Sequence, residues 1–522
     1  MDLNKTALGL ELGSTKIKGV LLDENHEIIA SGSFDWENKL VNGIWTYSMD
    51  EIHTGIQTCY KRLAEDFAEK FSAPLTTVGA IGISGMMHGY LPFDASGELL
   101  TPFRTWRNTI TGEAAEKLTA LFGFNIPQRW SIAHLYQAML NGEEHLPRLS
   151  HLTTLAGYIH KKLPGCGVLG VGEASGMIPI DSEKMWYDEK MAAQFDGLIA
   201  DMGYSWKLLD ILPGVLTAGE EAGVLTEEGA AFLDPTGTLK PGIPFAPPEG
   251  AAGTGMAATN SVKVYTGNVS AGTSDFAMVV VDHQPGVHRE LDMVTTPDGL
   301  PVAMVHCNNC TSDINAWAGL FADFLRAAGL NLPESELYRV LFRAALDGEP
   351  DCGGLLSYNY FSGEGITDVN EGRPIFLHQP DSKMNLGNFM RTHLLSALAT
   401  LKIGLDILTQ EEKIRIDKLY GHGGFFKVPE AGQRMLSAAA GVPVSVMQTA
   451  GSGGPYGMAL LAAYRLNREP GEALPDYLEK KVFANAESTT LLADEKDIEG
   501  FNTFLARYRK AFPVELAAIE NF

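Results

Sequence analysis

The chain has 522 residues, of which 45% are hydrophobic and 20% are charged, the composition of an ordinary globular protein. Because a typical domain has about 100–200 residues, this length predicts at least two hydrophobic cores and excludes a small binding module. The 64 acidic residues outnumber the 40 basic ones, and the net charge of −24 argues against nucleic acids and anionic membranes as partners.

The first predicted elements are two strands, residues 7–12 and 16–23, joined by the turn Gly13-Ser14-Thr15. A third strand over residues 28–34, a helix with one apolar stripe over residues 50–71 and a buried strand over residues 78–84 follow. This order of elements indicates an α/β fold.

The turn between the first two strands has groups that suit an anion. Its successive N–H groups, the hydroxyls of Ser14 and Thr15, and the cations of Lys16 and Lys18 could hold a terminal phosphate. An ordinary hairpin turn with solvated lysines is the alternative. Glu11 precedes the turn in an otherwise apolar strand, and a hydrated magnesium ion beside the phosphate would explain a carboxylate there.

Polar and aromatic residues follow the strand that ends near residue 84. Met87 and His88 fall at the carboxyl end of this strand, where α/β sheets bind ligands, and His88 could hydrogen-bond a polyol. Arg104 offers the N–H donors of a planar guanidinium group and Trp106 offers an aromatic ring, a combination that many sugar sites have. The alternatives are a structural histidine and packing at a domain edge. Residues 106–163 are predicted to be mostly helical.

Residues 235–248 are rich in proline and glycine and give the predicted boundary between two domains, residues 1–247 and 248–522. The second half starts in the same way as the first, with a Gly/Ala loop over residues 250–256, a strand over 262–270, a turn over 271–274 and a strand over 276–282. Gly272 and Thr273 of this second turn could also approach a phosphate closely. We therefore expect two α/β halves with a cleft between them.

The last predicted elements are helices over residues 388–408 and 429–440, with a glycine-rich loop ahead of the second. Gly423, Gly424 and Lys427 belong to this loop, which could admit the flat face of a nucleotide base. A loop that merely enters a helix is the alternative.

The five cysteines are an odd number spread over the chain, so no disulfide framework is expected and a reducing cytoplasm is the default. Cys307 and Cys310 form a C-x-x-C pair, but no second pair completes a zinc site, and we expect no metal there. The start of the chain lacks a signal-peptide pattern, and every apolar run is interrupted before about 18 residues, so neither export nor a membrane span is expected.

Taken together, these motifs resemble those of the FGGY family of carbohydrate kinases, the xylulokinase, ribulokinase and glycerol kinase group of the actin-like (ribonuclease H-like) ATPase superfamily. The resemblance extends over more than 400 residues in the family's order, because residues 8–18, 83–89, 270–274, 360–374 and 423–433 each resemble a family motif. It implies a two-domain actin-like fold with a sugar site and a first phosphate loop in the first half, and a second phosphate loop and an adenosine site in the second.

The resemblance also implies residue roles. Met87, His88, Arg104 and Trp106 would line the sugar site, and Glu11 would serve magnesium. The nucleotide would be held by the following residues: Gly13, Ser14, Thr15, Lys18, Gly272, Thr273, Gly423, Gly424 and Lys427. The expected activity is ATP- and magnesium-dependent phosphorylation of a primary hydroxyl of a ketose, with xylulose or ribulose as the leading candidates, by a cytoplasmic enzyme that could be a homodimer.

The sequence departs from the family at the general base. Counting back from Gly272 without a gap, the family's aspartate falls on Ala251, whose methyl group cannot accept a proton. We expect an inactivating change there, natural or introduced. The alternatives are that Glu249 serves as the base or that the loop is shifted. A non-catalytic protein that binds sugar and nucleotide, and an ATPase of the actin or chaperone type, are the rival functions.

Overall fold

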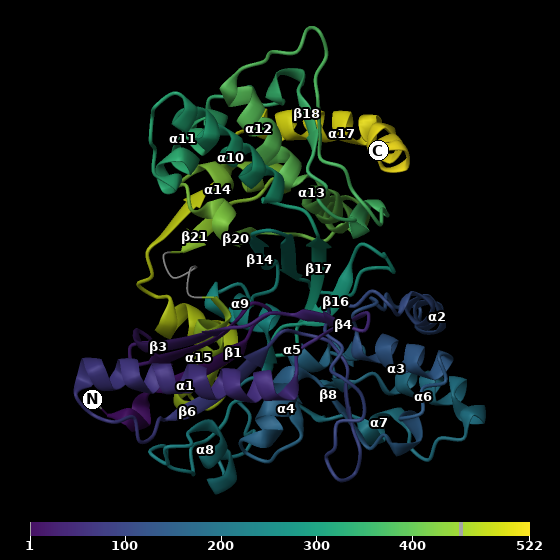
Figure 1. Ribbon diagram of the computed structural model, residues 1–522, viewed down its shortest axis with the longest axis vertical. Helices are drawn as coiled ribbons and strands as arrows, with labels where there is room; N and C mark the ends of the chain where they lie inside the picture. Colours follow the sequence, from purple (N-terminus) through teal and green to yellow (C-terminus); the bar gives the residue numbers. More distant parts are fainter. Residues whose placement is uncertain (1, 448–452) are drawn as a thin grey trace. The chain divides into compact units, whose positions relative to one another are not determined.

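The computed structural model describes residues 2–447 and 453–522 and divides the chain into two compact units. Unit 1 contains Met1–Val262, Met293–Val302 and Ser452–Asn485, and unit 2 contains Lys263–Asp292, Ala303–Gly451 and Ala486–Phe522. Each unit combines a sheet with helices (Figure 1), which confirms the predicted α/β fold class. The single boundary after residue 247 stays a prediction.

The main sheet of unit 1 has five strands in the order β13-β6-β1-β2-β3. Strands β1, β2 and β3 run antiparallel, whereas β6 and β13 run parallel to β1. The bounds are β1 Ala7–Leu12, β2 Lys16–Leu22, β3 Ile28–Asp35, β6 Ala80–Gly85 and β13 Glu249–Gly250. The opening strand–turn–strand prediction is therefore confirmed.

Helices cover this sheet, and two of them come from opposite ends of the chain. Helix α1 (Met49–Phe71) starts at a capping box formed by Ser48 and Glu51, and it lies along β3 (Figure 1). Helix α15 (Gly453–Asn467) packs on β1 at Gly9, where an added Cβ would lie 2.2 Å from the carbonyl oxygen of Pro455. Only a residue without a side chain allows this close approach.

The remaining elements of unit 1 surround this core. Its other helices are α2 Gly112–Phe122, α3 Ser131–Leu140, α4 Leu155–Lys162, α5 Val171–Ala174, α6 Glu189–Leu198, α7 Leu208–Ile211, α8 Glu227–Leu233, α9 Ala251–Ala258 and α16 Leu474–Tyr477. Its short strands are β4 Lys39–Val41, β5 Ile44–Thr46, β7 Leu91–Phe93, β8 His151–Thr153, β9 Val168–Gly170, β10 Ile180–Asp181, β11 Trp186–Tyr187 and β12 Gly214–Leu216.

The predicted loop over residues 250–256 is wrong, because α9 begins at Ala251. Alanine favours helix, and the glycines of this segment serve packing. At Gly253, an added Cβ would lie 3.2 Å from Pro297 and 3.3 Å from the Glu249 carboxylate.

The second main sheet of the chain has seven strands in the order β16-β17-β15-β14-β20-β21-β22, of which β14, β15, β20, β21 and β22 lie wholly within unit 2. The bounds are β14 Thr266–Ala271, β15 Asp275–Val280, β16 Asp292–Thr295, β17 Pro301–Cys307, β20 Lys418–His422, β21 Val444–Met447 and β22 Ser488–Leu491, and a separate pair is formed by β18 Leu356–Tyr358 and β19 Ile375–Leu377. The helices are α10 Ser312–Ala327, α11 Glu334–Leu346, α12 Leu386–Ala397, α13 Ala399–Asp406, α14 Ala431–Ala440 and α17 Glu495–Asn521.

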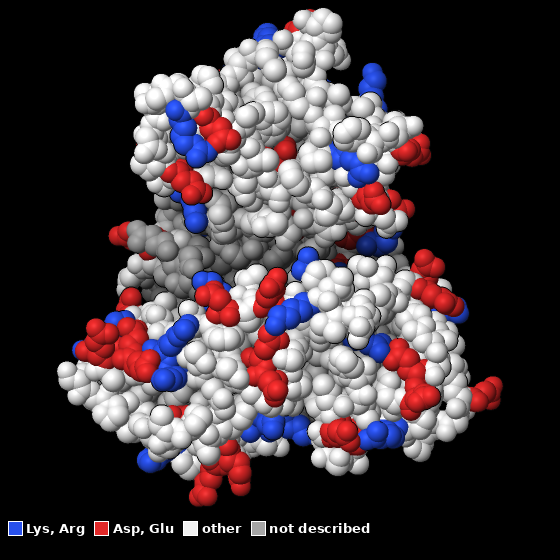
Figure 2. Space-filling view, in the orientation of Figure 1, with Lys and Arg blue, Asp and Glu red and all other residues white. Residues whose placement is uncertain are grey.

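The helix predicted over residues 388–408 is interrupted. It forms α12 and α13, which meet at Leu398, where φ is −107° and ψ is 1°. Over the described part of the chain, no helix combines the length and apolar character that crossing a bilayer requires. Figure 2 shows acidic and basic side chains scattered among each other over the visible face rather than gathered by sign.

Candidate active site

Three predicted motifs of unit 1 meet at one edge of its sheet. Strands β1, β6 and β13 are adjacent and parallel, with Leu12 paired to Gly85 and Gly85 paired to Gly250. The carboxyl ends of β1 and β6 bring the Gly13-Ser14-Thr15 turn and the Met87-His88 segment together, and Glu249 of β13 joins them because it pairs with Ser84 near the end of β6. This edge is where sheets of α/β proteins place ligands.

The carbonyl groups of the first turn are used within the protein, whereas two of its N–H groups are not. Every carbonyl of the turn is already bonded: those of Gly13 and Ser14 accept from Trp36 and Tyr47, and that of Thr15 accepts from the Trp36 backbone. The N–H groups of Ser14 and Thr15 have no acceptor among the residues that the structure describes. The turn therefore presents donors to any bound group, which suits an anion.

Glu11 lies beside this turn and has no hydrogen-bond partner within residues 2–447 and 453–522. It faces Lys18 on β2, and an added Cβ on Gly454 would lie 2.0 Å from its Oε1 atom. Burial raises the pKa of Glu11 to about 7, and the Lys18 charge opposes this shift. A half-buried carboxylate without a partner, next to a set of phosphate-type donors, fits a hydrated magnesium ion.

The segment after β6 has an unusual backbone. His88 is buried and has φ of +67°, a conformation that costs a non-glycine residue of order 1 kcal/mol or more. Its Nδ1 atom lies 3.0 Å from the carbonyl oxygen of Gly176, and its ring stacks on Trp130. Met87 lies beside it, in contact with the backbone of Gly250. Packing thus fixes the direction of His88.

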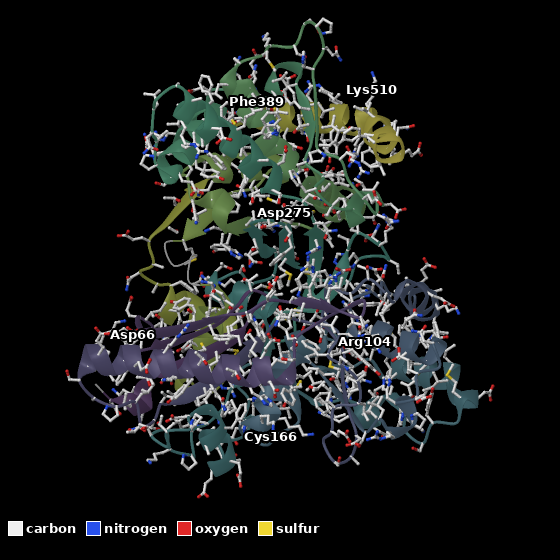
Figure 3. All side chains as sticks on the ribbon, in the orientation of Figure 1. Asp66, Arg104, Cys166, Asp275, Phe389 and Lys510 are labelled. Carbon is white, nitrogen blue, oxygen red and sulfur yellow. The ribbon has the colours of Figure 1, made fainter. Side chains whose placement is uncertain are left out.

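Arg104 and Trp106 are held by neighbours in unit 1. Arg104 (labelled in Figure 3) pairs with Glu143 and lies over the Tyr90 ring, 5.2 Å from its centroid. Trp106 is half-buried and packs against the core of the unit. Their assignment to the sugar stays a prediction.

Two buried carboxyl groups lie together near Met87 and the backbone of Gly250. Glu249 is 1% exposed and accepts from the N–H groups of Gly172 and Gly250 at 3.2 and 3.3 Å. Glu173 is fully buried, and its Oε2 atom would lie 2.5 Å from a Cβ added to Gly250. Three glycines, at positions 170, 172 and 250, leave the space that the two carboxyl groups occupy.

The surroundings favour the neutral form of both acids. Burial raises the pKa of Glu249 to about 8, and Asp298 adds to the shift while the backbone donors oppose it. Burial and then the Glu249 charge raise the pKa of Glu173 to about 8, against the Thr154 hydroxyl. A carboxyl with a pKa near the working pH can accept a proton in one step and release it in the next.

From the sequence, Glu173 is expected only as part of a segment, residues 173–176, that resembles one near the family's sugar site, and Asp298 has no expected role. Asp298 comes from residues 293–302, which lie far along the chain but belong to unit 1, where Thr295 donates to Ser175. No local pattern marks this segment. Ala251, the position predicted for the base, is the first residue of α9 and is half-buried.

Unit 2 repeats the arrangement of the first turn. The carbonyls of Gly272, Thr273 and Ser274 accept from Thr311, Cys310 and Gly272. Across the described ranges, the N–H groups of Thr273 and Ser274 meet no acceptor. This second turn thus also points donors outward.

The glycine-rich loop lies directly beside this second turn. Strand β20 runs parallel to β14, and a Cβ on Gly423 would lie 2.3 Å from the carbonyl oxygen of Ala271. Gly423 also has φ of +102°, so both space and backbone require glycine. A Cβ on Gly424 would meet nothing within 4 Å, and Lys427 is exposed.

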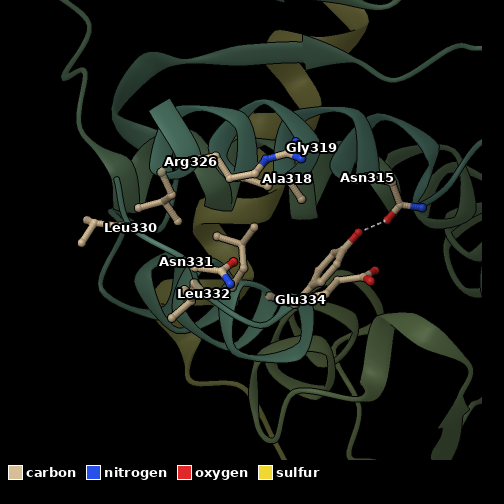
Figure 4. Close-up of a pocket in the computed structure, with 12 residues that line it drawn as sticks. Asn315, Ala318, Gly319, Arg326, Leu330, Asn331, Leu332 and Glu334 are labelled. Carbon is tan, nitrogen blue, oxygen red and sulfur yellow. Dashed lines mark hydrogen bonds between the residues drawn. The ribbon is translucent and has the colours of Figure 1, made fainter. Parts of the chain in front are cut away.

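A pocket of about 540 Å³ lies between α10 and α11 of unit 2 (Figure 4). Apolar groups line it, together with Arg326, Glu334 and the bonded pair Tyr338 and Asn315. The loop after β20 reaches α11 through the rings of Phe425 and Phe342, whose centroids are 6.0 Å apart.

The C-x-x-C pair is buried in unit 2, near Asp275, which Figure 3 labels. Burial raises the pKa of both thiols well above the ordinary value, which suppresses their reactivity. Within the described residues, no three His, Cys, Asp or Glu side chains are arranged to hold a metal ion.

Two sequence models of one family match the chain. The N-terminal domain of the FGGY family of carbohydrate kinases matches residues 6–250, and its C-terminal domain matches residues 267–466. The chain belongs to the FGGY family of carbohydrate kinases. The predicted resemblance is thus confirmed, and the two matches cover the turns and loops described above.

Individual FGGY relatives are distant. The chain is 21% identical to a xylulose kinase from Haemophilus influenzae over 431 residues, which is 77% of this chain and 80% of that protein. It is 22% identical to a xylulose kinase from Lactococcus lactis over 211 residues, which is 36% of this chain and 39% of that protein. A xyloylose kinase from Brucella ovis has the same fold, with a TM-score of 0.78, 18% identity and coverage of 98% of this chain and all of that one.

Proposed function

We propose that this FGGY kinase transfers the γ-phosphoryl group of ATP to a primary hydroxyl of a small open-chain sugar, with xylulose or ribulose as the expected substrate. The observation that carries the proposal is the convergence of an anion-binding turn, the His88 segment and a buried carboxyl at one edge of the unit 1 sheet. The relatives named xylulose kinase support a ketopentose.

In this proposal, each turn holds phosphate oxygens with its outward N–H groups. Ser14 and Thr15 provide these donors in unit 1, and Thr273 provides one in unit 2. The adenosine moiety is assigned to the loop at Gly423 and Gly424 and to the pocket between α10 and α11, because the loop packs on α11 through Phe425 and Phe342. Glu11 would hold the magnesium ion, which neutralises phosphate charge when bound.

We assign the general base to Glu249 in preference to position 251. Phosphoryl transfer needs a group that accepts the proton of the attacking hydroxyl, and the methyl group of Ala251 has no lone pair. Glu249 is the first residue of β13 and pairs with Ser84 of β6, the strand that His88 follows, and its carboxyl has a pKa of about 8. A chain with this carboxyl in place is expected to be active.

The test is coupled ADP release over a panel of ketopentoses, ketohexoses and polyols. We expect the unaltered chain to turn over one ketopentose, and Glu249→Gln to lower kcat at least 100-fold while sugar binding is retained. Turnover by Ala251→Asp alone would instead place the base at position 251. If both chains bind sugar and ATP without turnover, the protein is a non-catalytic binding protein.

A further inference from the structure

Two aromatic side chains lie directly behind the first turn of unit 1. Trp36 follows β3 and Tyr47 follows β5, and both are buried. Their rings stack, with centroids 4.1 Å apart and an angle of 27° between the planes. The pair forms a rigid apolar support for the turn.

Each ring also donates one hydrogen bond to the turn. The Trp36 indole Nε1–H donates to the carbonyl oxygen of Gly13 at 2.7 Å, and the Tyr47 hydroxyl donates to that of Ser14 at 2.5 Å. Burial raises the pKa of Tyr47 above its ordinary value, so the hydroxyl keeps its proton at any physiological pH.

These two bonds set the direction of the donors on the other side. A trans peptide unit is planar, and its C=O and N–H groups point in opposite directions. The carbonyl of Gly13 and the N–H of Ser14 belong to one peptide unit, and the carbonyl of Ser14 and the N–H of Thr15 belong to the next. Holding the carbonyls inward therefore turns the two N–H groups outward.

We propose that Trp36 and Tyr47 are positioning residues for the phosphate site: by anchoring the carbonyls of Gly13 and Ser14, they aim the next two N–H groups at the nucleotide. The inference rests on the proposed function of this turn. Without either anchor, the peptide can rotate and present a carbonyl oxygen, which repels phosphate.

The variants Trp36→Phe and Tyr47→Phe remove one donor each and keep an aromatic ring. We expect each to weaken ATP binding, measured by calorimetry, about five- to tenfold, and to raise the KM for ATP by a similar factor while the KM for the sugar stays within about twofold. The double variant should lose less than the product of the single effects, because both side chains hold one turn.

Two matched controls remove the same kinds of bond elsewhere in unit 1. Trp206→Phe removes an indole donor to the carbonyl of Leu146, and Tyr464→Phe removes a hydroxyl donor to the carbonyl of Glu472. Both should bind ATP like the unaltered chain.

The outcomes separate this inference from the function on which it rests. If the unaltered chain binds no ATP, the proposed function fails. If it binds ATP and the two variants bind equally well, or if the controls lose as much affinity, the positioning role is overturned and the function stands. Equal rises in the KM for ATP and for the sugar would also overturn it, because they would indicate a general loss of structure.

Discussion

Glu249 can accept a proton only when its carboxyl group is ionised. Its pKa of about 8 places most of the ligand-free protein in the neutral form at pH 7. The neighbouring Glu173 has a raised pKa as well, and two carboxyl groups in one buried space resist ionising together. With Glu249 as the proposed base, we therefore expect the activity to depend on the ionisation of this pair.

We expect kcat/KM to rise with pH through about 8 and to fall about tenfold for each pH unit below it, because kcat/KM reports groups of the free enzyme. Asp298→Asn removes the acid whose charge adds to the raised pKa of Glu249, and it should move the rise in kcat/KM to lower pH. A pH profile between 5.5 and 9.5 measures both effects.

The control for this profile is Glu65→Gln, which removes an exposed carboxylate of α1 and should leave the pH dependence of kcat/KM unchanged. A profile that is flat between pH 6 and 9 would rule out Glu249 as the base.

At the scale of elements, the contact between β1 and α15 depends on the absence of side chains. A methyl group at Gly9 would lie 2.2 Å from the carbonyl oxygen of Pro455 and 2.5 Å from the backbone nitrogen of Ala459. Backbone atoms cannot rotate away as side chains can, so the helix as a whole would have to shift.

We expect Gly9→Ala to lower the free energy of unfolding by about 2–4 kcal/mol, as overpacking of a core does. Gly197→Ala in α6 is the matched control, because its added methyl group meets nothing within 4 Å and alanine favours helix. Urea unfolding measures both variants, and equal stability of the two would contradict this account of the contact.

The sequence could predict the features that depend on residues close together in the chain, and it could not predict those that depend on contacts between distant segments. The turn at Gly13 was predictable because a strand, a turn and a strand follow one another in the chain. The pairing of Glu173 with Glu249 was not, because it depends on which strands are neighbours in the sheet. The segment at Ala251 was misjudged because alanine and glycine occur together both in loops and in closely packed helices.

At the scale of the whole molecule, unit 1 is assembled from segments that are distant in the chain. Residues 293–302 supply Asp298 near Glu249, and α15 supplies the packing on β1. The remaining segment, residues 1–262, contains all five strands of the sheet but lacks these two contributions.

A fragment of residues 1–262 should therefore be unstable by itself, because the apolar face of β1 that α15 covers would be open to water. We expect it to lack a cooperative thermal transition and to bind a dye for exposed apolar surface, whereas the full chain melts cooperatively. A fragment that melts cooperatively would show that α15 is dispensable for the core.

The late arrival of α15 also matters while the protein is being made. Strand β1 leaves the ribosome well before its helical cover, because β1 ends at Leu12 and α15 begins only at Gly453. At about 5–20 residues per second, the interval is roughly 20–90 s, much longer than the time a small domain needs to collapse. Throughout that interval the nascent sheet carries an uncovered apolar face, so we expect the yield of folded protein in a cell to rise with chaperones that shield it.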